Sequence, residues 1–161
     1  MSIKTKRIIY LICTILITTF IFYNSMKNGE DSSKASMSVL NIINTILNKL
    51  GINLTITGHF VRKSAHFIEF FVFGIFIMLI FISFATTNQI FNIIGFPMFF
   101  AIFIPVIDEY IQLFSVGRAS SVKDALLDFL GSICGILLVC IRFKIKNRKK
   151  IDTDTLDDKI T

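Results

Sequence analysis

The chain has 161 residues, of which 53% are hydrophobic and only 17% are charged, and its mean hydropathy is +0.71. Soluble domains carry about 25% charged residues. A single domain of this length has too small an interior to bury so much apolar surface, and a disordered chain contains few apolar residues. The composition therefore excludes a disordered chain, argues against a soluble enzyme, and favours a single all-α domain in a membrane.

The net charge of +6 is concentrated near the two ends of the chain. Nine of the 17 cationic residues lie beside the first or the last apolar run: Lys4, Lys6, Arg7, Arg142, Lys144, Lys146, Arg148, Lys149 and Lys150. Cations in such positions are typical of segments that anchor a membrane helix on its cytoplasmic side. We therefore expect membrane lipids as partners and no binding of nucleic acid.

Four apolar runs predict four transmembrane helices, at about residues 8–23, 65–85, 90–113 and 125–143. A helix needs about 20 residues to cross the hydrocarbon core, within a range of about 17 to 25, so the first run is slightly short. The first run also resembles a signal peptide. No small-residue cleavage site follows it, and we interpret it as an uncleaved anchor.

The basic flanks predict a multi-pass protein of the cell membrane with both termini in the cytoplasm. The connection at residues 86–89 would then be a tight cytoplasmic turn, and the first and third connections would face outside. From Ser38 to Leu50 the apolar positions have helical spacing, which predicts a short amphipathic helix on the membrane surface or over the bundle end. Residues 1–150 would form one domain, and the polar tail at 151–161 is predicted to be disordered.

Ionisable and polar residues in or beside the apolar runs form three groups, which we call together the polar cluster. The groups are Arg62, Lys63, His66 and Glu69; Asp108, Glu109 and Gln112; and Arg118, Asp124 and Asp128. The predicted topology places all three at the external ends of their helices, so they should meet at one level of the membrane. Gly131 and Gly135 continue the helical face of Asp124 and Asp128, where small residues allow close helix packing.

Two interpretations of the polar cluster are open. Its members could pair with one another in an ion-pair network that locks three helices together. They could instead form a site for a polar headgroup or substrate, because ionisable residues inside a membrane usually serve function. In such a site Arg62 and Arg118 would hold a phosphate or carboxylate through paired hydrogen bonds.

An enzyme built on the polar cluster would have His66 as its base and Glu69 as the group that orients the imidazole. Asp108 and Glu109 complete the set of catalytic candidates. No activated nucleophile accompanies them, and no cofactor is indicated. We predict no metal site, because no spacing such as H-E-x-x-H is present, although carboxylates are the ligands that calcium and magnesium prefer.

Three motifs run through the polar cluster. R-K-x-x-H-F-x-E-[YF] matches residues 62–70, and D-E-x-x-Q-x-F-x-x-x-R matches residues 108–118. D-x-x-x-N-x-x-G matches residues 124–131, except that Asp128 stands in the Asn position. In order and spacing these motifs resemble the VanZ family of small membrane proteins, in which Pro is also common where this chain has Val116. The extra acid at Asp128 could shift the pairing or be a local variant, so the hydrogen-bonding role of that position stays open.

The resemblance implies a bacterial plasma-membrane protein and reduced susceptibility to teicoplanin-type glycopeptides, without a defined biochemical activity. We therefore expect a protein whose external polar cluster engages an envelope lipid, a lipid-linked cell-wall precursor or the lipoglycopeptide itself. The first alternative is a membrane enzyme that modifies an envelope lipid or polymer. The second alternative is a small transporter, which four helices without an internal repeat make less favourable.

Overall fold

A computed structural model describes residues 1–52, 54, 56–84 and 93–157, and from residue 149 onward it describes only the course of the helix. This part of the chain contains five α-helices and no β-strand. The helices are α1 (Ile3–Met26), α2 (Gly29–Lys49), α3 (Gly58–Phe84), α5 (Gly95–Gln112) and α6 (Val122–Asp157). Helices α1, α3, α5 and the first 27 residues of α6 are long and apolar enough to cross a membrane. The predicted all-α class with four spanning helices is confirmed.

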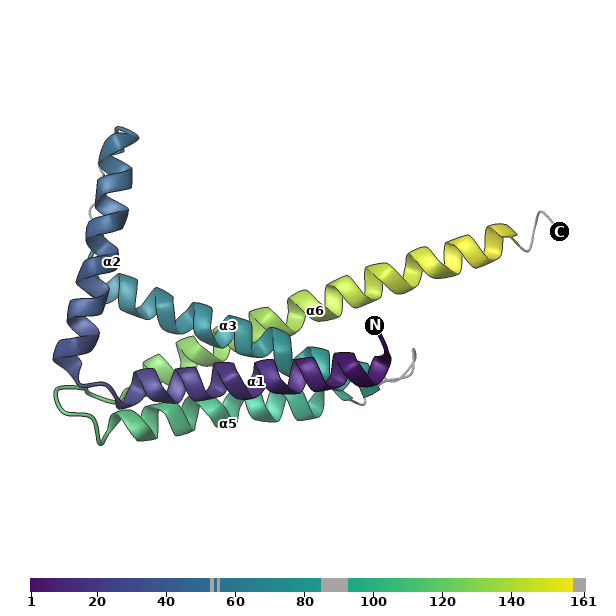
Figure 1. The fold of residues 1–161 in the computed structure, drawn as a ribbon, viewed down its shortest axis with the longest axis horizontal. Helices are drawn as coiled ribbons and strands as arrows, with labels where there is room; N and C mark the ends of the chain where they lie inside the picture. Colours follow the sequence, from purple (N-terminus) through teal and green to yellow (C-terminus); the bar gives the residue numbers. More distant parts are fainter. Residues whose placement is uncertain (53, 55, 85–92, 158–161) are drawn as a thin grey trace.

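The four spanning helices form one bundle, and α2 leaves it at a steep angle (Figure 1). The N-terminus and the exit of α6 lie at one end of the bundle. The α1–α2 connection, the start of α3 and the loop between α5 and α6 lie at the other end, which we call the loop end. The three groups of the polar cluster therefore all lie near the loop end.

The tightest helix contact joins α3 to α6. Gly74 on α3 lies so close to α6 that a Cβ atom there would overlap the backbone carbonyl of Ser132. Cβ atoms on Gly131 and Gly135 of α6 would likewise overlap backbone carbonyls of α3. Small residues at such a crossing let two helices approach until their backbones touch. The glycine face predicted beside Asp124 and Asp128 is thus the face that packs on α3.

The apolar side chains divide between a bundle core and a lipid-facing surface. The core contains residues from all four spanning helices: Ile21, Phe70, Phe73, Ile77, Met78, Ala101, Ile136 and Val139. Many other large apolar residues of the spanning helices remain exposed, among them Leu16, Phe99 and Ile102, which are 63%, 56% and 51% exposed. Outward apolar side chains on the spanning helices fit a bundle surrounded by lipid.

The amphipathic helix is longer than the sequence predicts, because α2 already begins at Gly29. The Asn28 side chain accepts a hydrogen bond from the Asp31 backbone N–H at 2.7 Å. Glu30 and Asp31 place negative charge in the first helical turn. An Asn cap and acidic first-turn residues both stabilise a helix start, so polar residues extend the helix beyond its apolar pattern.

The prediction of a disordered tail at 151–161 is wrong for residues 151–157, which continue α6. Residues 144–157 contain neither Gly nor Pro, and extension of an existing helix requires no new nucleation. The predicted turn at 86–89 and the last four residues of the tail, 158–161, lie outside the described residues.

Candidate functional site

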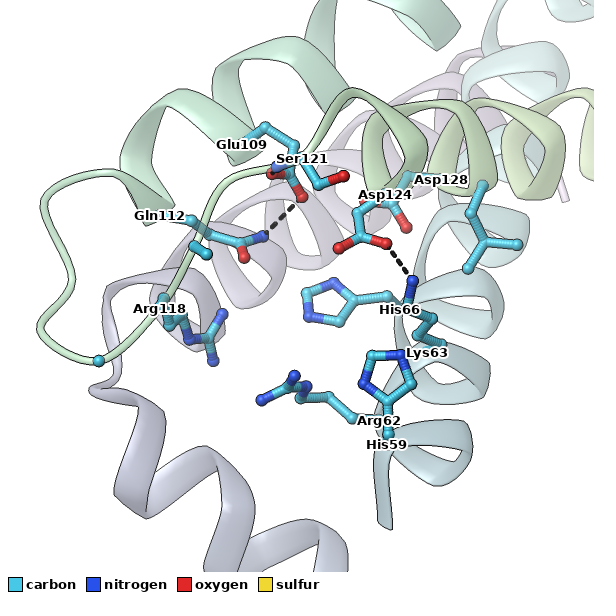
Figure 2. A pocket seen from close by; sticks show the side chains of 13 residues that line it. His59, Arg62, Lys63, His66, Glu109, Gln112, Arg118, Ser121, Asp124 and Asp128 are labelled. Atoms are coloured by element: carbon cyan, nitrogen blue, oxygen red, sulfur yellow. Dashed lines mark hydrogen bonds and ion pairs between the residues drawn. The ribbon is translucent and has the colours of Figure 1, made fainter. Parts of the chain in front are cut away.

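A polar cavity of about 380 Å³ opens at the loop end of the bundle (Figure 2). Eight of the ten residues of the polar cluster line it: Arg62, Lys63, His66, Glu109, Gln112, Arg118, Asp124 and Asp128. They come from the start of α3, the end of α5, the α5–α6 loop and the start of α6. The structure thus brings together residues separated by more than sixty positions in sequence.

The two remaining members of the polar cluster lie beside this cavity. Asp108 is completely buried between the helices. Glu69 lines a second, neighbouring cavity. His59, one turn before Lys63 on α3, lines the polar cavity but was not among the predicted site residues.

Helix α1 contributes two site residues that the sequence interpretation missed. Asn24 Nδ2 donates a hydrogen bond to Glu69 Oε1 at 2.9 Å. Ser25 Oγ donates to Asp108 Oδ1 at 2.6 Å, and both side chains of this pair are fully buried. The sequence feature that indicates these two residues is the change from apolar to amide and hydroxyl side chains at the end of the first apolar run.

Neutral donors hold most of the acidic side chains in place. Gln112 Nε2 donates to Asp108 Oδ2 at 2.8 Å and to Glu109 Oε1 at 3.3 Å. Glu109 Oε2 accepts from the Ser121 backbone N–H at 2.7 Å. Buried carboxylates need such partners, because an unpaired polar group in an apolar interior is costly.

Within the described residues the polar cluster contains one salt bridge, between Lys63 on α3 and Asp124 on α6, at 2.5 Å (Figure 2). Both side chains are about one third exposed, at 35% and 32%. The structure therefore lacks, in this part of the chain, the extended ion-pair network that was one interpretation of the cluster.

We expect the Lys63–Asp124 pair to contribute little to stability. A partly exposed ion pair is typically worth about 0.2 to 1 kcal/mol. A double-mutant cycle with Lys63→Met and Asp124→Asn, read from the free energy of unfolding in detergent, should give a coupling within this range. A coupling of about 3 kcal/mol would show instead that the pair behaves as a buried ion pair that stabilises the packing of α3 on α6.

Arg118 is fastened by the end of α1. Its Nη2 donates to the backbone carbonyl of Asn24 at 2.9 Å, whereas its Nε is buried without a partner in the structure. Burial lowers the pKa of Arg118 from its ordinary value, and the nearby positive charge of Arg62 lowers it further. Figure 2 shows Arg62 and Arg118 extending toward one another from α3 and from the loop. Two guanidinium groups in this arrangement favour an anion between them.

The α5–α6 loop is tied to the α1–α2 connection. Ser115 Oγ donates to the Ser25 carbonyl at 2.7 Å, and the Gly29 N–H donates to the Val116 carbonyl at 2.9 Å. Gly117 has a φ of 75°, a conformation that favours glycine. A Cβ atom on Gly29 would overlap the Gly117 carbonyl. The two glycines therefore allow the backbone contact that positions Arg118.

The second cavity, which we call the apolar cavity, has a volume of about 340 Å³ and lies between α2 and α3. Its apolar lining includes Val39 and Ile43 of α2 and Phe60 and Ile68 of α3. Asn24, Lys27 and Glu69 lie on its polar side, together with Arg62, His66 and Arg118, which also line the polar cavity. The two cavities thus meet at these three shared side chains.

Two side chains that line the apolar cavity each have an atom without a hydrogen-bond partner in the structure. His66 Nδ1 and Glu69 Oε2 are both buried and unpartnered. Among the described residues, His66, Asp108 and Asp128 also offer ligand atoms close enough to hold a metal ion. A molecule that enters the cavities can therefore form hydrogen bonds with these two atoms, and a cation can bind to the three ligand atoms.

Comparison with protein families assigns most of the chain. A model of the VanZ/LLP1 family matches residues 8–143, which include α3, α5, most of the other two spanning helices and every residue of the polar cluster. Comparisons with curated proteins and with solved structures give no match. The chain therefore belongs to the VanZ/LLP1 family of proteins, and its four apolar helices make it a multi-pass membrane protein.

Proposed function

We propose that the protein binds an anionic amphiphile at the external surface of a bacterial cell membrane, and thereby lowers susceptibility to teicoplanin-type glycopeptides. The amphiphile would be an envelope lipid, a lipid-linked cell-wall precursor or the lipoglycopeptide itself. One observation carries the proposal. A polar cavity and an apolar cavity share Arg62, His66 and Arg118, so one ligand could place its charged group in the first and its acyl chain in the second.

The polar cavity contains two guanidinium groups that form no salt bridge with any described residue. Lys63 is paired with Asp124, but no salt bridge engages Arg62 or Arg118 among the described residues. Burial and then the nearby Arg62 charge lower the pKa of Arg118, and an anion between the two guanidinium groups would relieve their repulsion. A phosphate or carboxylate matches the planar donor face of a guanidinium group.

The apolar cavity offers a path for an acyl chain. Val39 and Ile43 form its wall on α2, and Phe60 and Ile68 form its wall on α3. Each methylene buried there would contribute about 0.8 kcal/mol. The predicted cytoplasmic position of both termini would place the loop end, and with it both cavities, at the external membrane surface.

The test is the inhibitory concentration of teicoplanin in a susceptible Gram-positive host. Expression of the wild-type chain should raise this concentration, and Arg62→Gln should return it close to the value with empty vector at equal membrane abundance. Loss of one charged hydrogen-bond donor costs about 1.5 to 3 kcal/mol of binding, or roughly tenfold to a hundredfold in affinity.

The control is Lys123→Gln, which removes one positive charge from an exposed residue at the start of α6. It should protect as well as the wild type. The proposed role would be contradicted if the wild-type chain reached the membrane and gave no protection, or if Arg62→Gln protected fully.

A membrane enzyme acting on an envelope lipid or polymer is the second candidate. The observation that favours it is the pair of unpartnered buried atoms, His66 Nδ1 and Glu69 Oε2, on side chains that both line the apolar cavity. Glu69→Gln separates the two functions. It should nearly abolish the effect of an enzyme that needs this carboxylate, and should weaken a binding protein only by degrees.

A further inference from the structure

We infer that His66, Asp108 and Asp128 form a binding site for one divalent transition-metal ion, Mn²⁺ or Zn²⁺. The three side chains come from α3, α5 and α6, and one ligand atom of each lies within 4.8 Å of the other two. Binding of this ion is a property separate from the proposed binding of an amphiphile, because the ion can bind without a lipid.

The spacing of the three groups suits a metal ion. Ligand atoms at about 2.1 Å from an ion can be separated by up to about 4.2 Å. In a tetrahedral site the three atoms would lie about 3.4 Å apart, so side-chain rotations that close each separation by up to about 1.4 Å would bring all three into coordination. The ligands lie on three different helices, so no spacing within one helix could have indicated them.

The two carboxylates are deeply buried, and within the described residues only Asp108 accepts hydrogen bonds, from Ser25 and Gln112. Asp108 is 0% and Asp128 is 2% exposed. In the described part of the chain neither forms a salt bridge, and no hydrogen bond to Asp128 is present. Two carboxylates close together in an apolar interior repel one another unless a cation or a proton lies between them.

The imidazole provides the second observation. His66 Nδ1 is a buried atom with no hydrogen-bond partner. A neutral imidazole nitrogen without a donor is an available metal ligand. The unpaired carboxylate of Asp128 and the unpaired imidazole nitrogen of His66 therefore lie close together, and one cation could pair with both.

The ligand set selects the class of ion. Magnesium and calcium usually take only oxygen ligands, whereas one imidazole with two carboxylates suits zinc or manganese. His66 and Asp128 also line the polar cavity. The remaining coordination positions would thus face the cavity, where water or an anionic oxygen beside Arg62 could occupy them.

The test uses the full-length protein purified in detergent and stripped with EDTA. Titration with MnCl₂, followed by the electron paramagnetic resonance signal of free Mn²⁺, should show one saturable ion per chain. Zinc retained after dialysis should give the same stoichiometry by mass spectrometry. Asp128→Asn and His66→Gln should each weaken binding by about tenfold or more, and Glu30→Gln, which changes an exposed acid on α2, should not.

A second measurement makes the result independent of variants that fold poorly. Saturating Mn²⁺ or Zn²⁺ should raise the melting temperature of the wild type and of Glu30→Gln, and should leave that of Asp128→Asn unchanged. Absence of saturable binding by the folded wild-type protein would overturn the site. Equal binding by wild type, Asp128→Asn and His66→Gln would also overturn it. Neither teicoplanin nor an anionic lipid is added in these measurements, so the outcome is separate from that of the teicoplanin experiment.

Discussion

Replacement of Gly74 by valine is expected to remove most of the folded protein from the membrane. A side chain there would meet the Ser132 backbone on α6, and a backbone cannot rotate away as a flexible side chain can. Gly131 and Gly135 hold the same two helices together above and below this point, so α3 and α6 would have to separate over several turns. Overpacking typically costs about 1 to 3 kcal/mol where neighbours can adjust, and the cost here should exceed that.

Membrane abundance and the melting temperature in detergent would measure this effect. Gly74→Ala, which adds a single methyl group, should give an intermediate loss. The control is Gly95→Ala at the start of α5, because a Cβ atom at Gly95 meets nothing within 4 Å. That variant should fold as well as the wild type, since alanine favours a helix over glycine by up to about 1 kcal/mol. A Gly74→Val protein with unchanged abundance and melting temperature would refute the close backbone contact.

Arg118→Gln is expected to cause the largest loss of ligand binding of any single change outside the helices. The side chain lines both cavities, and its unpartnered Nε adds a donor that an incoming anion could use. Loss of two charged donors to one anion should lower affinity by roughly a hundredfold or more. Native mass spectrometry would measure the binding of phosphatidylglycerol, with phosphatidylcholine as the zwitterionic comparison.

The matched control is Arg148→Gln, the same chemical change on an exposed residue far along α6. It should bind phosphatidylglycerol as the wild type does. The melting temperature of Arg118→Gln should also be followed, because its Nη2 donates to the Asn24 carbonyl. A variant that melts like the wild type and still prefers the anionic lipid would contradict the assignment of Arg118 to the anion.

Much of the fold could be predicted from hydropathy alone. Each of the four apolar runs corresponds to a helix, because a membrane span must satisfy its backbone hydrogen bonds internally and cover about 30 Å with apolar residues. The ends of the helices were less predictable. Helix α1 extends to Ile3–Met26 and α6 to Asp157, since polar residues continue a helix without contributing to the apolar pattern.

The candidate site was only partly predictable. Charged residues inside apolar runs indicated its members, since burying them without a reason is costly. The partners were not visible, because Asn24 and Ser25 at the end of α1 resemble ordinary loop residues until the fold places them against Glu69 and Asp108. The proximity of His66 to Asp128 likewise depends on how α3 crosses α6, which no local pattern specifies.

The length of α6 has a mechanical consequence. Its 36 residues rise about 1.5 Å each, which gives a rod of about 54 Å, whereas the hydrocarbon layer is about 30 Å thick. The surplus projects from the end of the bundle where the N-terminus lies (Figure 1). A tag or reporter joined directly after Asp157 would therefore be held about 20 Å from the lipid surface by a rigid helix.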